Sequence, residues 1–425
     1  MQAEGNLKTK IPVQYRKFRV MCWRRRIVGI AGAFLWLIAP TAYAQALHLQ
    51  LVWRQQFQSM PANFASIFFK PASIPGSFVV RGVLEGNQLL VFDQSGQLVQ
   101  TTPAGGVSAF YSSPTRTVFV LDELQPAALS PSIDEGPTSV SAMSNGTQIW
   151  QRQTDFEDET IVADSGLSVD LDHAIAVLTF YDKQGNPVRQ VQPFGKPLPW
   201  SDERSAFGAF SQDSSVFAFL ATTPLAQGVA LFLYDNTGNA LLSTTVQGLQ
   251  VAEGLGLSPN GNSALLVGWT QNPASNAAAQ LVGMVSDSQG RIVQPFAVPS
   301  IGEQVQISVD SSTGDFVLDT GSGTIIRVSA TSPASIFSLG GVFNATAVAS
   351  NGGLTAWVSL EPVGSQLNQT NLVLRIVSQT GILLLQRTLG GNTLNLDTPN
   401  VWLSQDGKFV AVRFSDEIRY YEFSR

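Results

Sequence analysis

A four-residue turn of the form Asp-x-x-Gly, with β-rich residues on both sides, recurs along this chain and constrains its fold more than any other feature. The clearest copy is VALFLYDNTGNALLSTTV at residues 229–246, where the turn begins at Asp235 and ends at Gly238. An Asp side chain can accept a hydrogen bond from the backbone two residues on, and Gly adopts the positive φ that a tight reversal needs. We therefore expect a β-hairpin at every copy.

The copies are regularly spaced. Others begin at Asp93, Asp182 and Asp287, and a variant begins at Ser378. Successive copies lie 89, 53, 52 and 91 residues apart, and each long gap matches two units. The mean unit is therefore (378 − 93)/6, or 47.5 residues. This length is typical of one four-stranded blade of a β-propeller.

A second marker precedes the hairpins: a strand, a turn containing Ser or Asp, and another apolar strand. The best copy is GLGLSPNGNSALLVGW at residues 254–269. Seven such markers occur, and they begin at residues 108, 165, 208, 254, 306, 346 and 400. Each unit is predicted to run strand, turn, strand, loop, strand, Asp-x-x-Gly hairpin and strand, which is the order of an antiparallel blade.

The two ends of the chain predict that the blades close into a ring. The last unit, residues 400–423, supplies three strands and stops where a fourth is due. Residues 47–57, LHLQLVWRQQF, are a lone β-rich run that would complete this blade and remove two exposed sheet edges. With a further unit at residues 62–102, we expect eight blades. Seven is the alternative, because the first two units are the least regular.

Residues 1–44 are predicted to be a secretory signal peptide. Three arginines at residues 24–26 precede an apolar run at residues 27–40, and an Ala-x-Ala site follows at residues 42–44. This order is typical of segments that signal peptidase removes, so the mature protein would be a single domain at residues 45–425. A retained membrane anchor is the weaker alternative because the run is short. A twin-arginine signal lacks its usual flanking residues.

The segment also bears on the start codon and on the compartment. The polar residues before Met21 have no pattern, so the N-terminus is over-long if translation starts at Met21 rather than at Met1. Cys22 is the single cysteine of the chain, and the mature protein would therefore contain no disulfide and no lipoprotein-type cysteine. We expect a periplasmic or secreted protein with no membrane contact after cleavage.

Charge argues against a nucleic-acid partner. The first 44 residues hold 8 of the 25 Lys and Arg and 1 of the 31 Asp and Glu, which leaves 17 against 30, or −13, for the rest. Such an acidic surface repels phosphate backbones, and no basic aromatic stripe compensates for it. The low content of charged residues (13%) and the ample apolar content (44%) predict a globular domain with a large core.

The repeats resemble those of bacterial extracytoplasmic β-propellers of the WD-repeat-like and PQQ-like kinds, over most of residues 47–423. The turn at residues 235–238 is similar to the Asp- and Gly-containing element of PQQ-like repeats, but the Trp that docks neighbouring blades in that family is missing. The Trp-Asp dipeptide and its Gly-His partner are missing as well. The resemblance therefore implies an all-β propeller fold but no single family, and it carries over no functional residue.

The candidate chemical groups are few. The two histidines are His48, in the expected closing strand, and His173, beside Asp170 and Asp172. One His and two carboxylates could bind zinc or act as a base, but a metal site needs convergent ligands and no second His can join them. We interpret this segment as a solvated turn. No Gly-x-Ser-x-Gly motif marks a hydrolase nucleophile.

Acidic and aromatic residues offer two further possibilities. The acidic run at residues 155–159 could bind Ca²⁺, but it lacks the EF-hand pattern and is better interpreted as a solvated loop. Carboxylates from different blades could face each other for glycoside cleavage, although the sequence gives no spacing between blades. Six tryptophans follow the signal segment, and we expect them in blade cores or rims rather than in a sugar-binding platform. They are Trp53, Trp150, Trp200, Trp269, Trp357 and Trp402.

Two long polar interruptions are the candidate contact loops, because propellers bind partners through loops on one face. They are residues 270–280 and the Ser- and Pro-rich residues 126–146, and both are expected at the surface. Plain spacers are the alternative interpretation.

The sequence thus predicts an exported, all-β, eight-bladed propeller whose leading function is non-catalytic binding or scaffolding, with a protein or a glycan as partner. We assign no catalytic, cofactor-binding or metal-binding residue and no cofactor, because no convergent set of such groups is visible. The alternative is an enzyme whose site residues are dispersed over several blades. A quinone-dependent dehydrogenase and a polysaccharide-cleaving enzyme are the two examples.

Overall fold

The computed structural model describes most of the compact unit Gln45–Arg425. The described residues are 47–56, 78–82, 88–92, 97–103, 107–114, 117–124, 138–144, 147–154, 158–173, 175–195, 206–223, 228–271, 279–299, 305–339, 343, 345–363, 366–393, 399–414 and 417–424. Their regular secondary structure consists of β-strands, and these residues include no helix of the length and apolarity that crossing a membrane requires. The segment 1–44 lies outside them.

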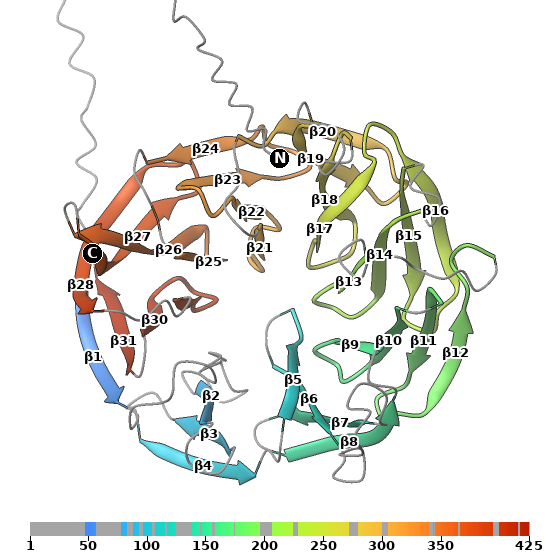
Figure 1. Cartoon of the computed structure of the whole chain (residues 1–425), viewed down its shortest axis with the longest axis horizontal. Helices are drawn as coiled ribbons and strands as arrows, with labels where there is room; N and C mark the ends of the chain where they lie inside the picture. The colour runs from blue at the N-terminus through green and yellow to red at the C-terminus, as the bar shows by residue number, and fades with distance from the viewer. Residues whose placement is uncertain are drawn as a thin grey trace, which may run out of the picture. The chain divides into compact units, whose positions relative to one another are not determined.

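The strands in these ranges form eight antiparallel sheets, seven with four strands and one with three. Figure 1 shows the sheets as successive blades around a ring. Blades 1 to 4 contain β2 (Phe78–Gly82), β3 (Gln88–Phe92) and β4 (Leu98–Pro103); β5 (Val107–Ser112), β6 (Phe119–Leu124), β7 (Thr138–Ser144) and β8 (Thr147–Thr154); β9 (Asp158–Val162), β10 (Ser168–Asp172), β11 (Val177–Tyr181) and β12 (Pro187–Val191); β13 (Ala206–Phe210), β14 (Val216–Thr222), β15 (Val229–Asp235) and β16 (Ala240–Val246).

Blades 5 to 8 continue in the same chain order. They contain β17 (Val251–Leu257), β18 (Ser263–Trp269), β19 (Leu281–Asp287) and β20 (Ile292–Ala297); β21 (Gln306–Val309), β22 (Phe316–Asp319), β23 (Thr324–Val328) and β24 (Ser335–Ser338); β25 (Ala345–Asn351), β26 (Leu354–Val363), β27 (Gln366–Ser378) and β28 (Leu383–Thr393); and β29 (Asn400–Leu403), β30 (Phe409–Phe414) and β31 (Glu417–Ser424) with β1 (His48–Gln56).

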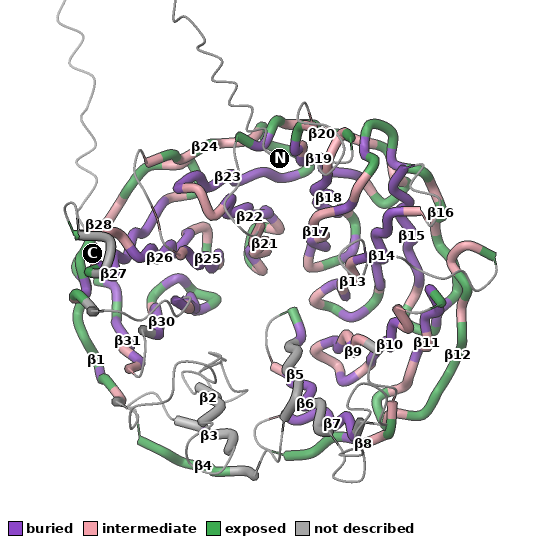
Figure 2. The backbone as a smooth tube through the Cα atoms, viewed as in Figure 1, coloured by how far each residue is buried: buried purple, intermediate pink, exposed green. Residues whose placement is uncertain are grey.

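Burial follows the position of a strand within its blade. In blade 4, the middle strands β14 and β15 are buried along almost their whole length, whereas the outer strand β16 alternates between exposed and partly buried residues. Figure 2 shows the same contrast around the ring, with buried tube in the middle of the blades and exposed tube at the circumference. Middle strands are covered on both faces by neighbouring blades, which is why they read as unbroken apolar runs in the sequence.

The Asp-x-x-Gly hairpins are confirmed wherever the structure describes them. Each connects the third strand of a blade to the fourth, and Gly238, for example, has a φ of 82°. The Asp235 carboxylate accepts hydrogen bonds from the backbone N–H groups of Thr237 (2.8 Å) and Asn239 (2.9 Å). Asp182 and Asp287 bond their turns in the same way. The copy at residues 93–96 lies outside the described residues.

The second marker is also confirmed, as the turn between the first and second strands of a blade. At Ser211 the side-chain oxygen accepts the backbone N–H of Val216 (3.0 Å), while the Ser211 N–H donates to the Val216 carbonyl oxygen (2.9 Å). The same pair of bonds recurs at Ser113, Ser258 and Ser404. A Ser at this position therefore satisfies the backbone that the reversal leaves unpaired.

The ring closes as expected from the chain ends. Strand β1 pairs antiparallel with β31, and Leu49 lies opposite Phe423 in the register. Trp53 of the same strand packs against Tyr420, with ring centroids 5.5 Å apart, and Leu90 of blade 1 joins this cluster. The N-terminal strand is thus the outermost strand of blade 8, and the blade is in contact with blade 1. The described residues agree with the eight-bladed prediction.

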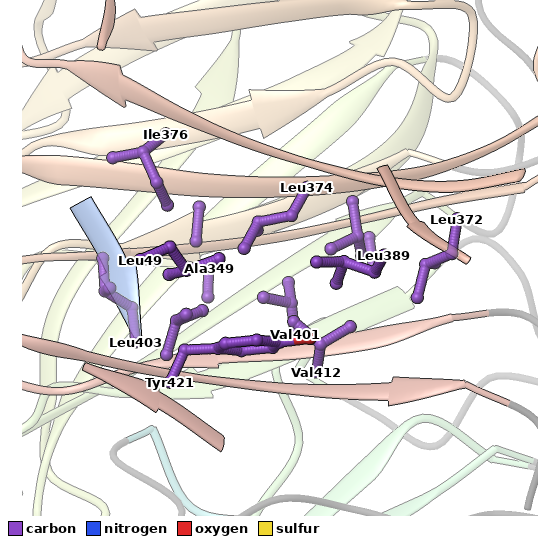
Figure 3. Packing of buried hydrophobic residues seen from close by; sticks show 14 of the residues in the cluster. Leu49, Ala349, Leu372, Leu374, Ile376, Leu389, Val401, Leu403, Val412 and Tyr421 are labelled. Atoms are coloured by element: carbon purple, nitrogen blue, oxygen red, sulfur yellow. The ribbon is translucent and has the colours of Figure 1, made fainter. Parts of the chain in front are cut away.

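The hydrophobic core is divided among the blade interfaces. Figure 3 shows the cluster between blades 7 and 8, where Leu374 and Ile376 of β27 and Ala349 of β25 meet Val412 of β30 and Leu49 of β1. Burying one side chain of the size of Leu contributes about 1.5–3 kcal/mol. Because each interface has its own cluster, the ring is stable only when every blade has both neighbours.

One sequence expectation is wrong. Residues 126–146 do not form one surface excursion, because 138–144 is strand β7 of blade 2. Within it Val140 and Ala142 are buried in the blade 2 cluster, and Ser139 accepts a hydrogen bond from the Gln151 side chain (2.6 Å). Small serines fit a crowded sheet once bonded, so the Ser-rich composition concealed a strand. Residues 125–137 lie outside the described residues.

Candidate binding face

The antiparallel blades sort their connections onto two faces of the ring. We call the face that carries the first-to-second and third-to-fourth strand connections the turn face. The opposite face carries the second-to-third connections and the links between blades, and we call it the loop face. On the turn face every connection between described strands has 2 to 6 residues, whereas on the loop face three of them have 11 to 14: 125–137, 192–205 and 270–280.

Turns of neighbouring blades bond to one another on the turn face. Thr117 of blade 2 donates to the Asp164 carboxylate of blade 3 (2.7 Å). The Asp213 N–H of blade 4 donates to the Pro259 carbonyl of blade 5 (3.0 Å), and Ser311 of blade 6 donates to the Asn351 side chain of blade 7 (2.5 Å). These contacts place the first turns of successive blades side by side. Because their polar groups are bonded to each other, the turn face is short-looped and rigid.

The loop face carries both connections that the sequence singled out. The connection 270–280 leaves β18 and returns as β19, and residues 272–278 of it lie outside the described residues. Its base is fixed, because the Thr270 N–H donates to the Gln280 carbonyl oxygen (2.9 Å) and the Gln280 N–H donates to the Thr270 hydroxyl oxygen (3.2 Å). A loop with a fixed base presents its residues from a constant position.

The innermost strands next to the centre of the ring are mostly apolar or small. In β17 and β21 the partly buried positions include Val251, Leu255 and Ile307. Among the described side chains of β9, β13, β17, β21, β25 and β29, the charged ones are Glu159 and Glu253. The sequence alternative of a catalytic centre built from several blades would require Arg, His or carboxylate groups to converge there.

Glu253 and Trp269 form the most distinctive polar pair on the loop face. The Trp269 indole N–H donates to the Glu253 carboxylate (3.1 Å). Glu253 lies at an irregularity in β17, because Ala252 pairs with Gly268 and the next paired residue is Gly254. An extra residue of this kind turns its side chain in a new direction. The sequence shows the pair only as a lone acid in an apolar strand and a strand-ending Trp, so pattern reading missed it.

The His173 segment does not assemble a metal site in the structure. The His173 ring nitrogen Nε2 lies 3.4 Å from a Glu159 oxygen. Asp170 is instead bonded to Arg152 and Thr160, and Asp172 accepts the backbone N–H of Ile175 (3.1 Å). Within the described ranges no group of three or more His, Cys, Asp or Glu is arranged to hold a metal ion. His48 lies in β1 as expected, and most of the acidic run 155–159 lies outside the described ranges.

Arg152 joins blade 2 to blade 3. Its guanidinium donates to the Asp170 carboxylate (3.1 Å from Nε) and to the Ser168 hydroxyl (3.0 Å). The guanidinium also lies over two aromatic rings, 4.2 Å from the centroid of Trp150 and 3.7 Å from that of Tyr181. These contacts desolvate the charge and pair it fully, so Arg152 holds two blades together and is not presented to a ligand.

A second buried Arg joins blade 6 to blade 7. Arg327 donates to the carboxylates of Asp310 and Asp315, both at 2.8 Å, and the Gly353 N–H of blade 7 also donates to Asp310 (3.0 Å). Burial alone would raise the pKa of Asp310, but hydrogen bonds from Ser312 and Arg327 outweigh it and hold the pKa below its usual value. Asp310 is therefore charged and serves as an inter-blade anchor.

Asp319 is the one described carboxyl whose pKa is raised, and burial is the main cause. A raised pKa can mark a general acid. The Asp319 side chain has no exposed surface, however, and its carboxylate accepts the Gly321 backbone N–H (2.9 Å) in the turn that follows β22. A substrate cannot reach a group with no exposed surface, so we assign Asp319 to the blade 6 turn.

Comparisons with known proteins identify the fold. Neither protein-family models nor curated protein sequences match the chain. Solved structures do: a Dos1 propeller has a TM-score of 0.54 at 10% identity, covering 88% of this chain and 95% of its own. The chain folds as a β-propeller. A eukaryotic initiation factor has a TM-score of 0.50 at 11% identity, covering 84% of this chain and 83% of its own. These neighbours are WD40-type propellers, and at such identity they define the fold alone.

Five of the six tryptophans can now be placed. Trp53, Trp150, Trp357 and Trp402 are buried at blade interfaces, as the sequence predicts, and Trp269 is partly buried. Trp200 lies outside the described residues. The tryptophans therefore form no aromatic platform among themselves in the described part of the chain, and Trp269 alone reaches the loop face.

Proposed function

We propose that the propeller is a non-catalytic binding or scaffolding module that holds a protein partner on its loop face. The difference between the two faces carries this proposal. Backbone turns on the turn face are short and bonded to each other, whereas the three longest connections between blades or strands all emerge from the loop face. Binding residues concentrate on loops that a rigid scaffold positions.

The chemistry of the ring centre supports a binding role over a catalytic one. The charged side chains described on the innermost strands, Glu159 and Glu253, are bonded to His173 and Trp269. Neither pair is arranged as a nucleophile with its base, nor as two carboxylates flanking a bond. No observation in the described residues favours a quinone-dependent dehydrogenase or a polysaccharide-cleaving enzyme in particular, so we propose neither.

The proposal includes export. The signal-like segment ends at residue 44, and the closing strand β1 begins at His48, three residues after Gln45. Removal of residues 1–44 would therefore leave the whole ring intact in a periplasmic or secreted protein. N-terminal sequencing of the protein from the envelope or the medium of its native cell tests this: Gln45 is the expected first residue, and an unprocessed N-terminus would contradict export.

The binding role is tested by changing one face at a time. In the first variant a short Gly-Ser linker replaces residues 271–279 of the loop face, and in the control Gly replaces Asn236 and Thr237 in a turn-face hairpin. Both variants and the unchanged protein are cross-linked in native cells, and the captured proteins are identified by mass spectrometry. We expect the loop-face variant to lose a partner that the control retains, at equal thermal stability. Capture of the same proteins by both variants, or cross-links confined to the turn face, would refute the proposal.

A further inference from the structure

Trp269 differs from the other tryptophans that the structure describes. Trp53, Trp150, Trp357 and Trp402 have exposed fractions of 0 to 9%, whereas Trp269 is only partly buried. A Trp left partly open to water retains apolar and aromatic surface for contact. Such residues dominate the binding energy of protein interfaces when they lie in a fixed, central position.

The position of Trp269 is central and fixed. It ends β18 immediately before the pinned connection 270–280, and its apolar surroundings include Phe296 of β20 and Ile307 of the innermost strand β21. The ring thus lies beside the blade 5 to blade 6 interface. The backbone around it is tightly constrained, because a Cβ on Gly268 would lie 2.5 Å from the Val251 carbonyl oxygen. Only Gly fits at that point.

Glu253 supplies a negative charge beside the ring. The irregularity in β17 sets the direction of its side chain, and the Trp269 indole N–H bonds its carboxylate at 3.1 Å. The four strands of blade 5 contain no Lys or Arg. The blade therefore offers a carboxylate and an aromatic face, held together by one hydrogen bond, with no cation of its own strands beside them.

These two groups together match one kind of ligand. A carboxylate attracts a cation, and the face of an indole ring attracts the same cation through its quadrupole. Guanidinium and ammonium groups use both contacts at once, and Arg stacks on the ring as well. A sugar would gain from the ring but not from the charge.

We infer that Glu253 and Trp269 form a recognition site on the loop face for an Arg or Lys side chain of a protein partner. The inference rests on the proposed binding function and adds to it the chemical class of the contacted group. The partner would insert its cationic side chain at the rim of the ring, between the innermost strand of blade 5 and the base of the connection 270–280.

The experiment uses the chain from residue 45 to 425, with ¹⁵N in its Trp indoles, and neutral-capped decapeptides as probes. The peptides are identical except for one central residue, which is Arg, Lys or uncharged citrulline. Trp269→Phe assigns the Trp269 indole signal. We expect the Arg and Lys peptides, at millimolar concentration, to shift this signal, and the citrulline peptide to leave it unchanged. Glu253→Gln should weaken the Arg peptide about fivefold.

A matched control removes the same charge elsewhere. Glu422 is exposed on β31 in blade 8, and Glu422→Gln should bind the Arg peptide as the unchanged protein does. No shift of the Trp269 signal with any peptide, equal binding of the Glu253→Gln variant, or equal binding of the citrulline peptide would each overturn the inference. If Glu253→Gln also captures the loop-face partner unchanged in cells, the recognition site is wrong while the binding function stands. Loss of loop-face capture altogether would refute the function itself.

Discussion

The buried Arg327 network allows a quantitative test of how the blades are held together. Arg327→Met keeps most of the side-chain volume but removes the charge between Asp310, which is fully buried, and Asp315, which is 7% exposed. Removing one partner of a buried ion pair leaves an uncompensated charge and costs about 3–5 kcal/mol. Two carboxylates lose their partner here, so we expect a loss of free energy of unfolding in the upper part of that range at neutral pH.

The pH dependence follows from Asp310. Its pKa is held below the usual 3.8, so the stabilisation by Arg327 is present above that value and is lost as the pH falls through the lowered folded-state pKa. In Arg327→Met one cause of the low pKa is gone, and Asp310 takes up its proton at higher pH. The difference in stability between the two proteins should therefore be largest at neutral pH and shrink in acid.

Urea unfolding followed by circular dichroism measures this difference, and hydrogen exchange at Gly353, whose N–H donates to Asp310, measures it locally. Arg291→Met is the control, since the Arg291 side chain is 78% exposed and its loss should hardly change the urea midpoint. A loss below about 1 kcal/mol for Arg327→Met, or the same loss at neutral and acid pH, would refute the assignment of Arg327 as an inter-blade anchor.

Three further predictions concern the closing strand and the hairpins. Trp53→Ala should cost about 3–5 kcal/mol in urea unfolding, because it empties the contact between β1 and Tyr420; a loss below about 1 kcal/mol would contradict that packing. Gly238→Ala should destabilise more than Gly195→Ala, because both have positive φ but a Cβ on Gly238 would lie 2.8 Å from the Phe180 ring, whereas nothing lies within 4 Å at Gly195; thermal unfolding compares them, and equal losses would contradict the turn. Partial burial raises the pKa of Asp235, but hydrogen bonds from its turn outweigh it and lower the pKa to about 2, so the advantage of the unchanged protein over Asp235→Asn should persist above pH 3.8 and fade toward about pH 2; NMR titration of the carboxyl checks the value, and an ordinary pKa would refute the turn geometry.

The fold was predictable because its determinants are local and repeated. Asp235 and Gly238 fix one hairpin through bonds within five residues, and Ser211 fixes its turn through bonds to Val216. Copies of these devices report the blade length, and the blade length reports the ring. The closing strand was predictable because β1 is apolar at Leu49 and Trp53 and has no partner in its own unit.

The candidate recognition site was not predictable in the same way. Glu253 and Trp269 lie sixteen positions apart and meet because of an irregular pairing in β17, which no spacing in the sequence reveals. The buried bonds of Arg152 and Arg327 also cross between blades, to Asp170 and Gly353 of the next blade or its network. Contacts between repeats depend on how the sheets twist and pack, and one chain read alone contains no trace of that geometry.

Closure of the ring by β1 is the claim on which both faces and the recognition site depend, and one cross-link tests it directly. Gln50 and Glu422 lie opposite each other in the β1 to β31 register, at the Cα spacing that disulfides span, and the chain from residue 45 onward contains no other cysteine. With Gln50→Cys and Glu422→Cys, mild oxidation should give a monomer that carries one internal disulfide, while Gln50→Cys with Gln289→Cys should not. Free thiols or disulfide-linked dimers in the first variant would contradict a closed ring.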